Sequence, residues 1–208
     1  MASESTKSQA VENLAFIREM MEAGQRQTRF NATYMIVWGT LLAAAFLAQY
    51  FEALGYFSAS IPTIWLPPIL IGWAASIYIG IKTNTATDKN NPVIKAYSTA
   101  YMSIGITMSF YFFATLAFGT FDPVTITILA CGLYGAVHLI NGVVTGLFIF
   151  KATAVGWWGL MAYFTHDASH TKEMLLVLAG ACIVLILVPA VLIRASRSEV
   201  LTEAKTSV

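Results

Sequence analysis

The stretch 131-CGLYGAVHLINGVVTGLF-148 lies in a long apolar run, yet it carries a histidine, an asparagine, a threonine and four glycines. On a helical wheel at about 100° per residue, one stripe roughly 60° wide holds the polar side chains. These are Tyr134, His138, Asn141 and Thr145. A neighbouring stripe holds Gly135, Gly142 and Gly146, and the opposite side is apolar. Because unpaired polar groups in hydrocarbon cost several kcal/mol, we predict a membrane helix whose polar face points into a bundle or onto a second copy.

The composition of the whole chain supports an integral membrane protein. Hydrophobic residues make up 57% of the 208 residues and charged residues only 11%, whereas a soluble domain has about 25% charged residues. The net charge of +1 provides no basic field for nucleic acid, so we expect no nucleic-acid partner. The two cysteines, Cys131 and Cys182, lie in apolar runs and are expected to be buried thiols.

Six apolar segments approach the roughly 20 residues that a membrane-spanning helix needs. They are Tyr34–Phe51, Pro62–Ile81, Val93–Phe118, Val124–Phe150, Ala152–Phe164 and Met174–Ile193. The connections are short, with a turn expected near Lys151, and short connections make consecutive helices antiparallel neighbours. We therefore expect an all-α bundle of six transmembrane helices over residues 34–193, arranged as three antiparallel hairpins.

The positive charges predict how this bundle is oriented. With six spans and a cytoplasmic N-terminus, eleven of the twelve Lys and Arg residues fall on the inner side and only Lys172 falls outside. Loop Lys and Arg set orientation. If Ala152–Phe164 did not span, Arg194 and Arg197 would lie outside. The pattern favours a bacterial inner-membrane protein with both termini in the cytoplasm.

Two polar segments flank the predicted bundle. In residues 1–33, Val11, Leu14, Ile17 and Met21 recur at helical spacing. This spacing predicts an amphipathic helix on the inner membrane surface or against a protein partner. Residues 194–208 are expected to form a polar cytoplasmic tail.

Small residues predict where helices pack. Gly142 and Gly146 form a GxxxG pattern, which lets another helix backbone approach closely, and Gly135 lies on the same side. The second segment repeats the four-residue spacing with Gly72, Ser76 and Gly80. We predict that these positions pack helices within the chain or across a homo-oligomer.

The histidines offer three candidate chemistries. His138 at membrane depth is expected to be a neutral histidine bonded to a neighbouring group. It could instead bind haem or a metal, with Met102, Met108 or Met161 as a second ligand. In the outer loop, His166, His170 and Glu173 follow the spacing i, i+4, i+7, which also suits a metal site.

The sequence gives little sign of an enzyme or an ion-coupled transporter. No Asp, Glu, Lys or Arg lies in the middle of any predicted span, although pumps and proton-coupled transporters generally need such a group. There is also no Walker A, GxSxG, HExxH or dinucleotide-binding motif. We expect a protein without catalytic residues.

The N-terminal region resembles a known group of proteins. LAFIREMMEAGQRQTRF at 14–30, followed by VWG at 37–39, is similar to the start of a family of small bacterial polytopic integral membrane proteins. The ending LIRASR at 192–197 is similar as well. The resemblance implies the topology and assigns no functional residue.

Three functions are consistent with these features. The first is an oligomeric scaffold, or a sensing or interaction subunit, that uses the polar and glycine faces of 131–148 for association. The second is a small channel or facilitator for a neutral or weakly polar solute, with a path lined by the four residues of the polar stripe. The third is a haem- or metal-binding membrane protein built on His138.

Overall fold

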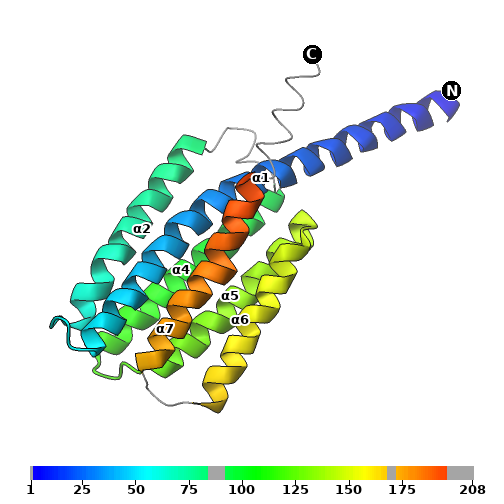
Figure 1. Cartoon of the computed structure of the whole chain (residues 1–208). Coiled ribbons are helices and arrows are strands. Elements are labelled where there is room, and N and C mark those ends of the chain that lie inside the picture. The colour runs from blue at the N-terminus through cyan, green and yellow to red at the C-terminus, as the bar shows by residue number, and fades with distance from the viewer. Residues whose placement is uncertain (1, 84–91, 168–171, 196–208) are drawn as a thin grey trace.

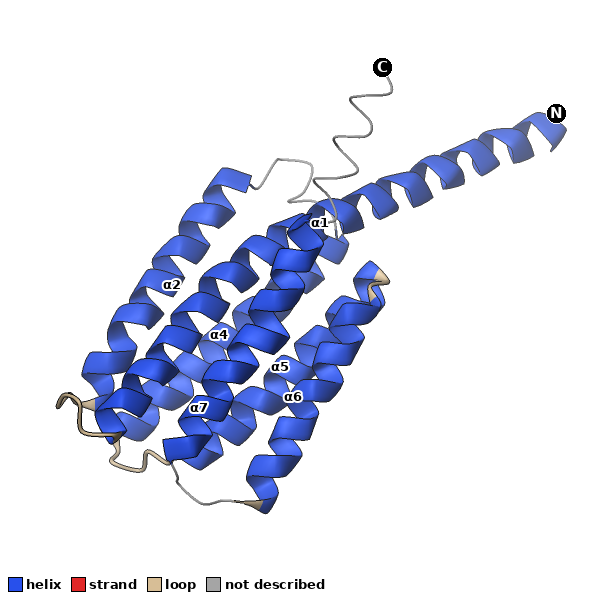
Figure 2. Ribbon diagram, viewed as in Figure 1, coloured by secondary structure: helices blue, strands red, loops and turns tan. Residues whose placement is uncertain are grey.

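The computed structural model describes residues 2–83, 92–167 and 172–195, which are helical apart from short connections (Figures 1 and 2). The helices are α1 Ala2–Ala53, α2 Ile61–Thr83, α4 Pro92–Ala117, α5 Pro123–Thr145, α6 Phe148–His166 and α7 Lys172–Ala181. A π-helical segment, η1 Cys182–Leu187, continues α7, and the chain stays helical to Ala195. The described residues contain no strand, so the all-α prediction is confirmed.

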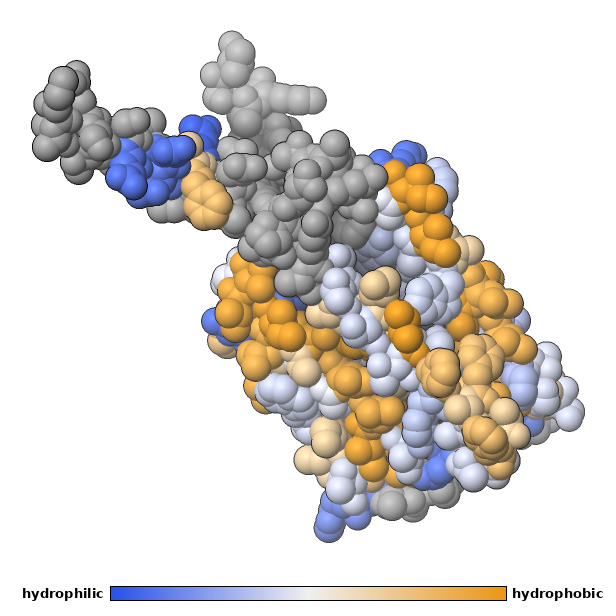
Figure 3. Space-filling view, turned by 180° about the vertical axis from the view of Figure 1, so that it is seen from behind, coloured by the Kyte–Doolittle hydropathy of each residue, from blue (hydrophilic) through white to orange (hydrophobic). Residues whose placement is uncertain are grey.

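Five segments are long and apolar enough to cross a membrane, which indicates a multi-pass membrane protein. They are Ala32–Ala53, Ile61–Lys82, Ser98–Ala117, Pro123–Thr145 and Lys172–Ala195. The sixth expected span, α6, is not among them because Lys151 and the less apolar Trp157 and Trp158 lower its hydropathy. With 19 residues, α6 is nevertheless about 28 Å long. It packs along α5 and parallel to the other helices (Figure 1). Apolar side chains spread over the rear face of the bundle in Figure 3.

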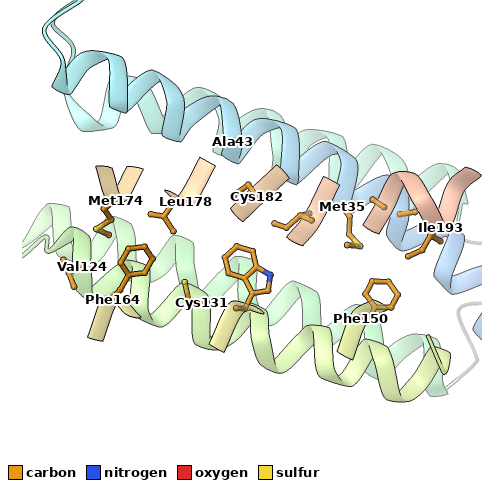
Figure 4. Packing of buried hydrophobic residues seen from close by; sticks show 14 residues of the cluster. Met35, Ala43, Val124, Cys131, Phe150, Phe164, Met174, Leu178, Cys182 and Ile193 are labelled. Carbon is orange, nitrogen blue, oxygen red and sulfur yellow. The ribbon is translucent and has the colours of Figure 1, made fainter. Parts of the chain in front are cut away.

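The helices form two rows that face each other. In Figure 1, α1 and α7 lie in front of α4 and α5, with α2 at one edge and α6 at the other. α1 packs on α2, α7 and η1, and α5 packs on α6. Figure 4 shows the buried side chains between the rows. Met174, Leu178 and Cys182 of the α7–η1 helix point toward Val124, Cys131, Phe150 and Phe164 of α5 and α6.

The N-terminal residues are helical, as expected, but they do not form a separate helix. α1 runs without a break for 52 residues, and its N-terminal part projects out of the bundle (Figure 1). Leu14 and Phe16 are both exposed. Their contact with a membrane surface or a partner stays a prediction. The polar tail from residue 196 onward lies outside the described residues.

The turn between α5 and α6 lies about one helical turn earlier than the sequence predicts. α5 ends at Thr145, Gly146 follows with a left-handed φ of 72°, and α6 begins at Phe148. The expected span to Phe150 and the turn near Lys151 are therefore wrong. A left-handed residue after a helix favours glycine, which has no Cβ to clash. The Thr145 hydroxyl accepts a hydrogen bond from the Leu147 backbone N–H at 3.3 Å, which stabilises the turn.

Candidate intramembrane binding cavity

A cavity of about 590 Å³ lies between the two rows of helices. Side chains of α1, α2, α4, α5 and the α7–η1 helix line it, together with Trp157 of α6. Its wall is dominated by aromatic, aliphatic and methionine side chains, among them Trp38, Phe46, Met108 and Ile186. Ligand sites in proteins have this character and volumes of about 300–1,000 Å³.

The polar stripe of α5 divides between the cavity and the packed interior. Tyr134 and His138 line the cavity. Asn141 is fully buried but lies outside the cavity wall, and Thr145 is half-buried at the end of the helix. His138 is only 1% exposed. The four residues therefore do not line one continuous path in the structure.

The hydrogen bonds of His138 define its tautomer. Its Nδ1 lies 2.8 Å from the Tyr134 carbonyl oxygen. A carbonyl oxygen only accepts, so Nδ1 carries the proton and donates. Nε2 of the neutral ring is then an acceptor. This atom is enclosed by its neighbours and has no hydrogen-bond partner among the described residues.

Asn141 connects α5 to α4. Its side-chain nitrogen donates to the hydroxyl of Tyr101, while its side-chain oxygen has no partner among the described residues. The sequence does not single out Tyr101. A tyrosine in an apolar helix is the only available signal, and Tyr101 is one of nine tyrosines in the chain.

Trp157 of α6 completes this polar region. Its ring stacks on Tyr134, with centroids 5.1 Å apart and planes inclined by 24°. It also lies near the His138 ring, at 6.5 Å between centroids. Its Nε1–H is a buried donor without a partner in the described part of the chain. The cavity wall thus holds an unused donor, Trp157 Nε1–H, and an unused acceptor, His138 Nε2, while Asn141 Oδ1 is a second unused acceptor outside the wall. Buried polar groups of this kind are usually satisfied.

The haem and metal hypotheses gain little from this geometry. Met102 and Met108 line the same cavity as His138, whereas Met161 lies elsewhere on α6. His138 Nε2 would have to be uncovered before it could bind iron. His166 at the end of α6 and Glu173 in the first turn of α7 are exposed, and His170 lies outside the described residues. The described residues contain no group of three or more His, Cys, Asp or Glu side chains arranged for a metal.

The glycines of α5 pack against α6 within the chain. A Cβ on Gly135 would collide with the ring of Trp158, and one on Gly142 would lie 3.0 Å from the Lys151 backbone nitrogen. Gly146 lies in the turn, and a Cβ placed on it would meet nothing within 4 Å. Within this chain, Gly142 and Gly146 therefore do not form a helix-packing pair of the GxxxG type.

The small residues of α2 receive aromatic side chains of α1. A Cβ on Gly72 would lie 2.6 Å from the Trp38 ring, and the hydroxyl of Tyr34 lies 3.4 Å from a Cβ on Gly80. Trp38 also donates to the Ser76 hydroxyl at 2.9 Å. The predicted packing stripe is therefore used inside the chain, with α1 as its partner.

α2 and α4 meet through the side chain of Trp73. Trp73 of α2 donates to the Ser109 hydroxyl of α4 at 3.3 Å. The Trp73 ring also lies 3.3 Å from a Cβ placed on Gly105. Two apolar side chains that line the cavity beside this contact, Ile77 and Met102, are 59% and 53% exposed.

Both cysteines lie where the sequence predicts. Cys131 and Cys182 are free, buried thiols in the core between the rows, and both line the cavity.

Comparison of the chain with protein-family models, curated proteins and solved structures found no match.

Proposed function

We propose that this protein binds a small, largely apolar molecule inside its transmembrane bundle, either to sense that molecule or to facilitate its passage. The cavity of about 590 Å³ carries the proposal, because its volume and its aromatic and aliphatic wall suit such a ligand. We therefore favour a facilitator, or a sensing subunit that binds a ligand, over a scaffold that binds none.

The scaffold hypothesis depends on the glycine face of α5 being free for a second copy. That face is occupied by α6, with Gly135 under Trp158 and Gly142 beside Lys151. A homo-oligomer would have to form through other surfaces. The projecting N-terminal part of α1 remains the segment we propose for a protein partner.

The ligand hypothesis can be tested with a stearic acid that carries a photoactivatable diazirine on its chain. Purified protein in lipid nanodiscs would be illuminated with the probe, and labelled peptides would be mapped by mass spectrometry. We expect labelling of the α5 peptide that contains Tyr134. Ala130→Phe should abolish it, because Ala130 lines the cavity.

Ala136→Phe is the matched control, because it introduces the same side chain at an exposed position of α5. It should leave cavity labelling intact. Labelling confined to lipid-facing residues in the wild type, or equal labelling in both variants, would contradict the proposal.

We further propose that the protein lies in a bacterial inner membrane with six spans and with both termini in the cytoplasm. The charges at the helix ends support this orientation. Lys82 lies in the last turn of α2, Lys151 in the first turn of α6 and Arg194 near the end of the helix after η1. These helix ends lie together at one end of the bundle in Figure 1, whereas α7 begins with Lys172 at the other end.

Single cysteines at positions 151 and 172 can test this topology in a Cys131→Ala/Cys182→Ala background. A membrane-impermeant maleimide added to spheroplasts should label Lys172→Cys, while Lys151→Cys should react only after the cells are lysed. If Lys172→Cys, like Lys151→Cys, reacts only after lysis, the two positions lie on the same side and α6 does not span the membrane.

A further inference from the structure

The contact between α2 and α4 lies at the middle of the membrane-spanning segments. Trp73 is near the centre of α2, which runs from Ile61 to Thr83, and Gly105 is near the centre of α4, which runs from Pro92 to Ala117. Trp73 lies 12 residues from Ile61 and 10 residues from Thr83, or roughly 18 Å and 15 Å of helix. Around this level the bundle is surrounded by hydrocarbon rather than water.

The helices on either side of this contact leave the cavity wall incomplete. Ile77 lies one helical turn from Trp73, and Met102 lies about one turn from Gly105. Both side chains line the cavity, yet both are more than half exposed at the outer surface of the bundle. A residue that faces both the cavity and the outside marks the edge of an opening. Figure 3 shows the rear face of the bundle, the side on which α4 lies.

We propose that the cavity is entered sideways from the bilayer, between α2 and α4, and that its ligand is the hydrocarbon chain of a membrane-dissolved amphiphile of the fatty-acid class. This inference rests on the proposed function, because it assumes that the cavity holds a ligand. A molecule that entered from water would need a polar entrance. At the level of Trp73 the exposed side chains that line the cavity, Ile77 and Met102, are instead apolar. The exposed polar lining residues lie elsewhere, Ser98 nearer the start of α4 and Lys172 at the start of α7.

Trp73 is the movable part of this entrance. Its Nε1–H donates a hydrogen bond to the Ser109 hydroxyl at 3.3 Å, just beyond the usual range of about 2.7–3.2 Å. Gly105 presents no side chain to the ring, so a rotation of Trp73 meets little resistance from α4. An amphiphile can then pass its chain inward while its polar head stays at the membrane surface.

The diazirine-bearing stearic acid can measure entry as a rate. In the Cys131→Ala/Cys182→Ala background, Ile77→Cys and Met102→Cys would be joined by o-phenylenedimaleimide in detergent before the protein is placed in nanodiscs. The probe is then supplied from donor vesicles, and illumination at successive times gives the rate of cavity labelling. We expect the link to slow labelling at least tenfold. Trp73→Ala should accelerate it severalfold.

The control is a chemical link between α5 and α6, away from the α2–α4 contact. Ala136→Cys and Val155→Cys lie on exposed positions of α5 and α6, and joining them in the same background should leave the rate unchanged. If the α2–α4 link and Trp73→Ala leave the rate unchanged while the cavity is still labelled, sideways entry is overturned and the ligand enters from a membrane surface. If the cavity is not labelled in the unlinked protein, the proposed function itself fails.

Discussion

The α5–α6 pair and the α2–α4 pair show two ways in which neighbouring helices of this bundle meet. α5 and α6 are joined by a two-residue turn, and glycines let the Trp158 and Lys151 side chains lie directly on the α5 backbone. α2 and α4 meet mainly through the Trp73 ring, which reaches across to Gly105 and Ser109. A Cβ on Gly135 would collide with the Trp158 ring, whereas a Cβ on Gly105 would lie 3.3 Å from the Trp73 ring. The same residue type therefore permits a closer helix contact in the α5–α6 pair than in the α2–α4 pair.

The largest effect on stability should come from a larger side chain between α5 and α6. Gly142→Leu places a branched side chain where even a Cβ lies 3.0 Å from the Lys151 backbone nitrogen. Because a backbone atom cannot move aside as a side chain can, we expect the free energy of unfolding to fall by about 3 kcal/mol. Unfolding in mixed detergent micelles would measure it. Val143→Leu, at an exposed neighbouring position, should change the free energy of unfolding by less than about 0.5 kcal/mol. Similar losses in the two variants would contradict close packing of Gly142 against α6.

The turn between α5 and α6 should be the next most sensitive site. Gly146 has a φ of 72° and nothing within 4 Å of a Cβ, so Gly146→Ala introduces backbone strain without a clash. We expect a loss of about 1–2 kcal/mol. Gly159→Ala also meets nothing within 4 Å, but it lies within α6. It should be neutral or slightly stabilising in the same measurement, and a destabilised Gly159→Ala would show that strain is not the cause.

Double-mutant cycles can compare how firmly α4 is held to each neighbour. Asn141→Ala with Tyr101→Phe removes the α5–α4 hydrogen bond. Trp73→Phe with Ser109→Ala removes the α4–α2 bond of 3.3 Å. Hydrogen bonds between membrane helices contribute about 0.6 kcal/mol on average and up to about 1.7 kcal/mol. We expect the first coupling energy near the upper value and the second at or below the average. The reverse order would mean that α2 and α4 are the more firmly joined pair.

The smallest effect is expected between α2 and α4. Gly105→Ala places a Cβ 3.3 Å from the half-buried Trp73 ring, which can shift toward the opening. We expect a change in unfolding free energy within about 0.5 kcal/mol. Gly135→Ala is the corresponding change in the α5–α6 pair, and it should cost at least about 1 kcal/mol because Trp158 must leave its place. Equal costs at the two glycines would remove the contrast between the pairs.

The sequence predicts much of the helical arrangement because apolar length and polar periodicity are local properties. The inward position of His138 and Asn141 follows from the wheel, and the four-residue spacing of Gly72, Ser76 and Gly80 indicates helix packing. The turn at Gly146 is misplaced because residues 147–150 continue the apolar run without interruption. A hydrophobic count cannot distinguish a helix that continues from one that turns back between two apolar segments.

The cavity could not be predicted from the sequence in the same way. Its volume depends on how far apart the two rows of helices lie, and no single segment encodes that distance. The pairing of Asn141 with Tyr101, and the stacking of Trp157 on Tyr134, likewise require contacts between different helices. Aromatic residues in membrane segments have many possible places, so their number alone does not indicate which ones form the site.

The unbroken α1 helix makes a mechanical connection between the interior of the bundle and the space beyond the membrane surface. Tyr34, Met35 and Trp38 of this helix line the cavity, and the same rod extends to Ala2 without a break. The part before Ala32 is about 45 Å long at 1.5 Å per residue. Because the helix is continuous, a displacement of Trp38 in the cavity wall would also change the direction of the part before Ala32.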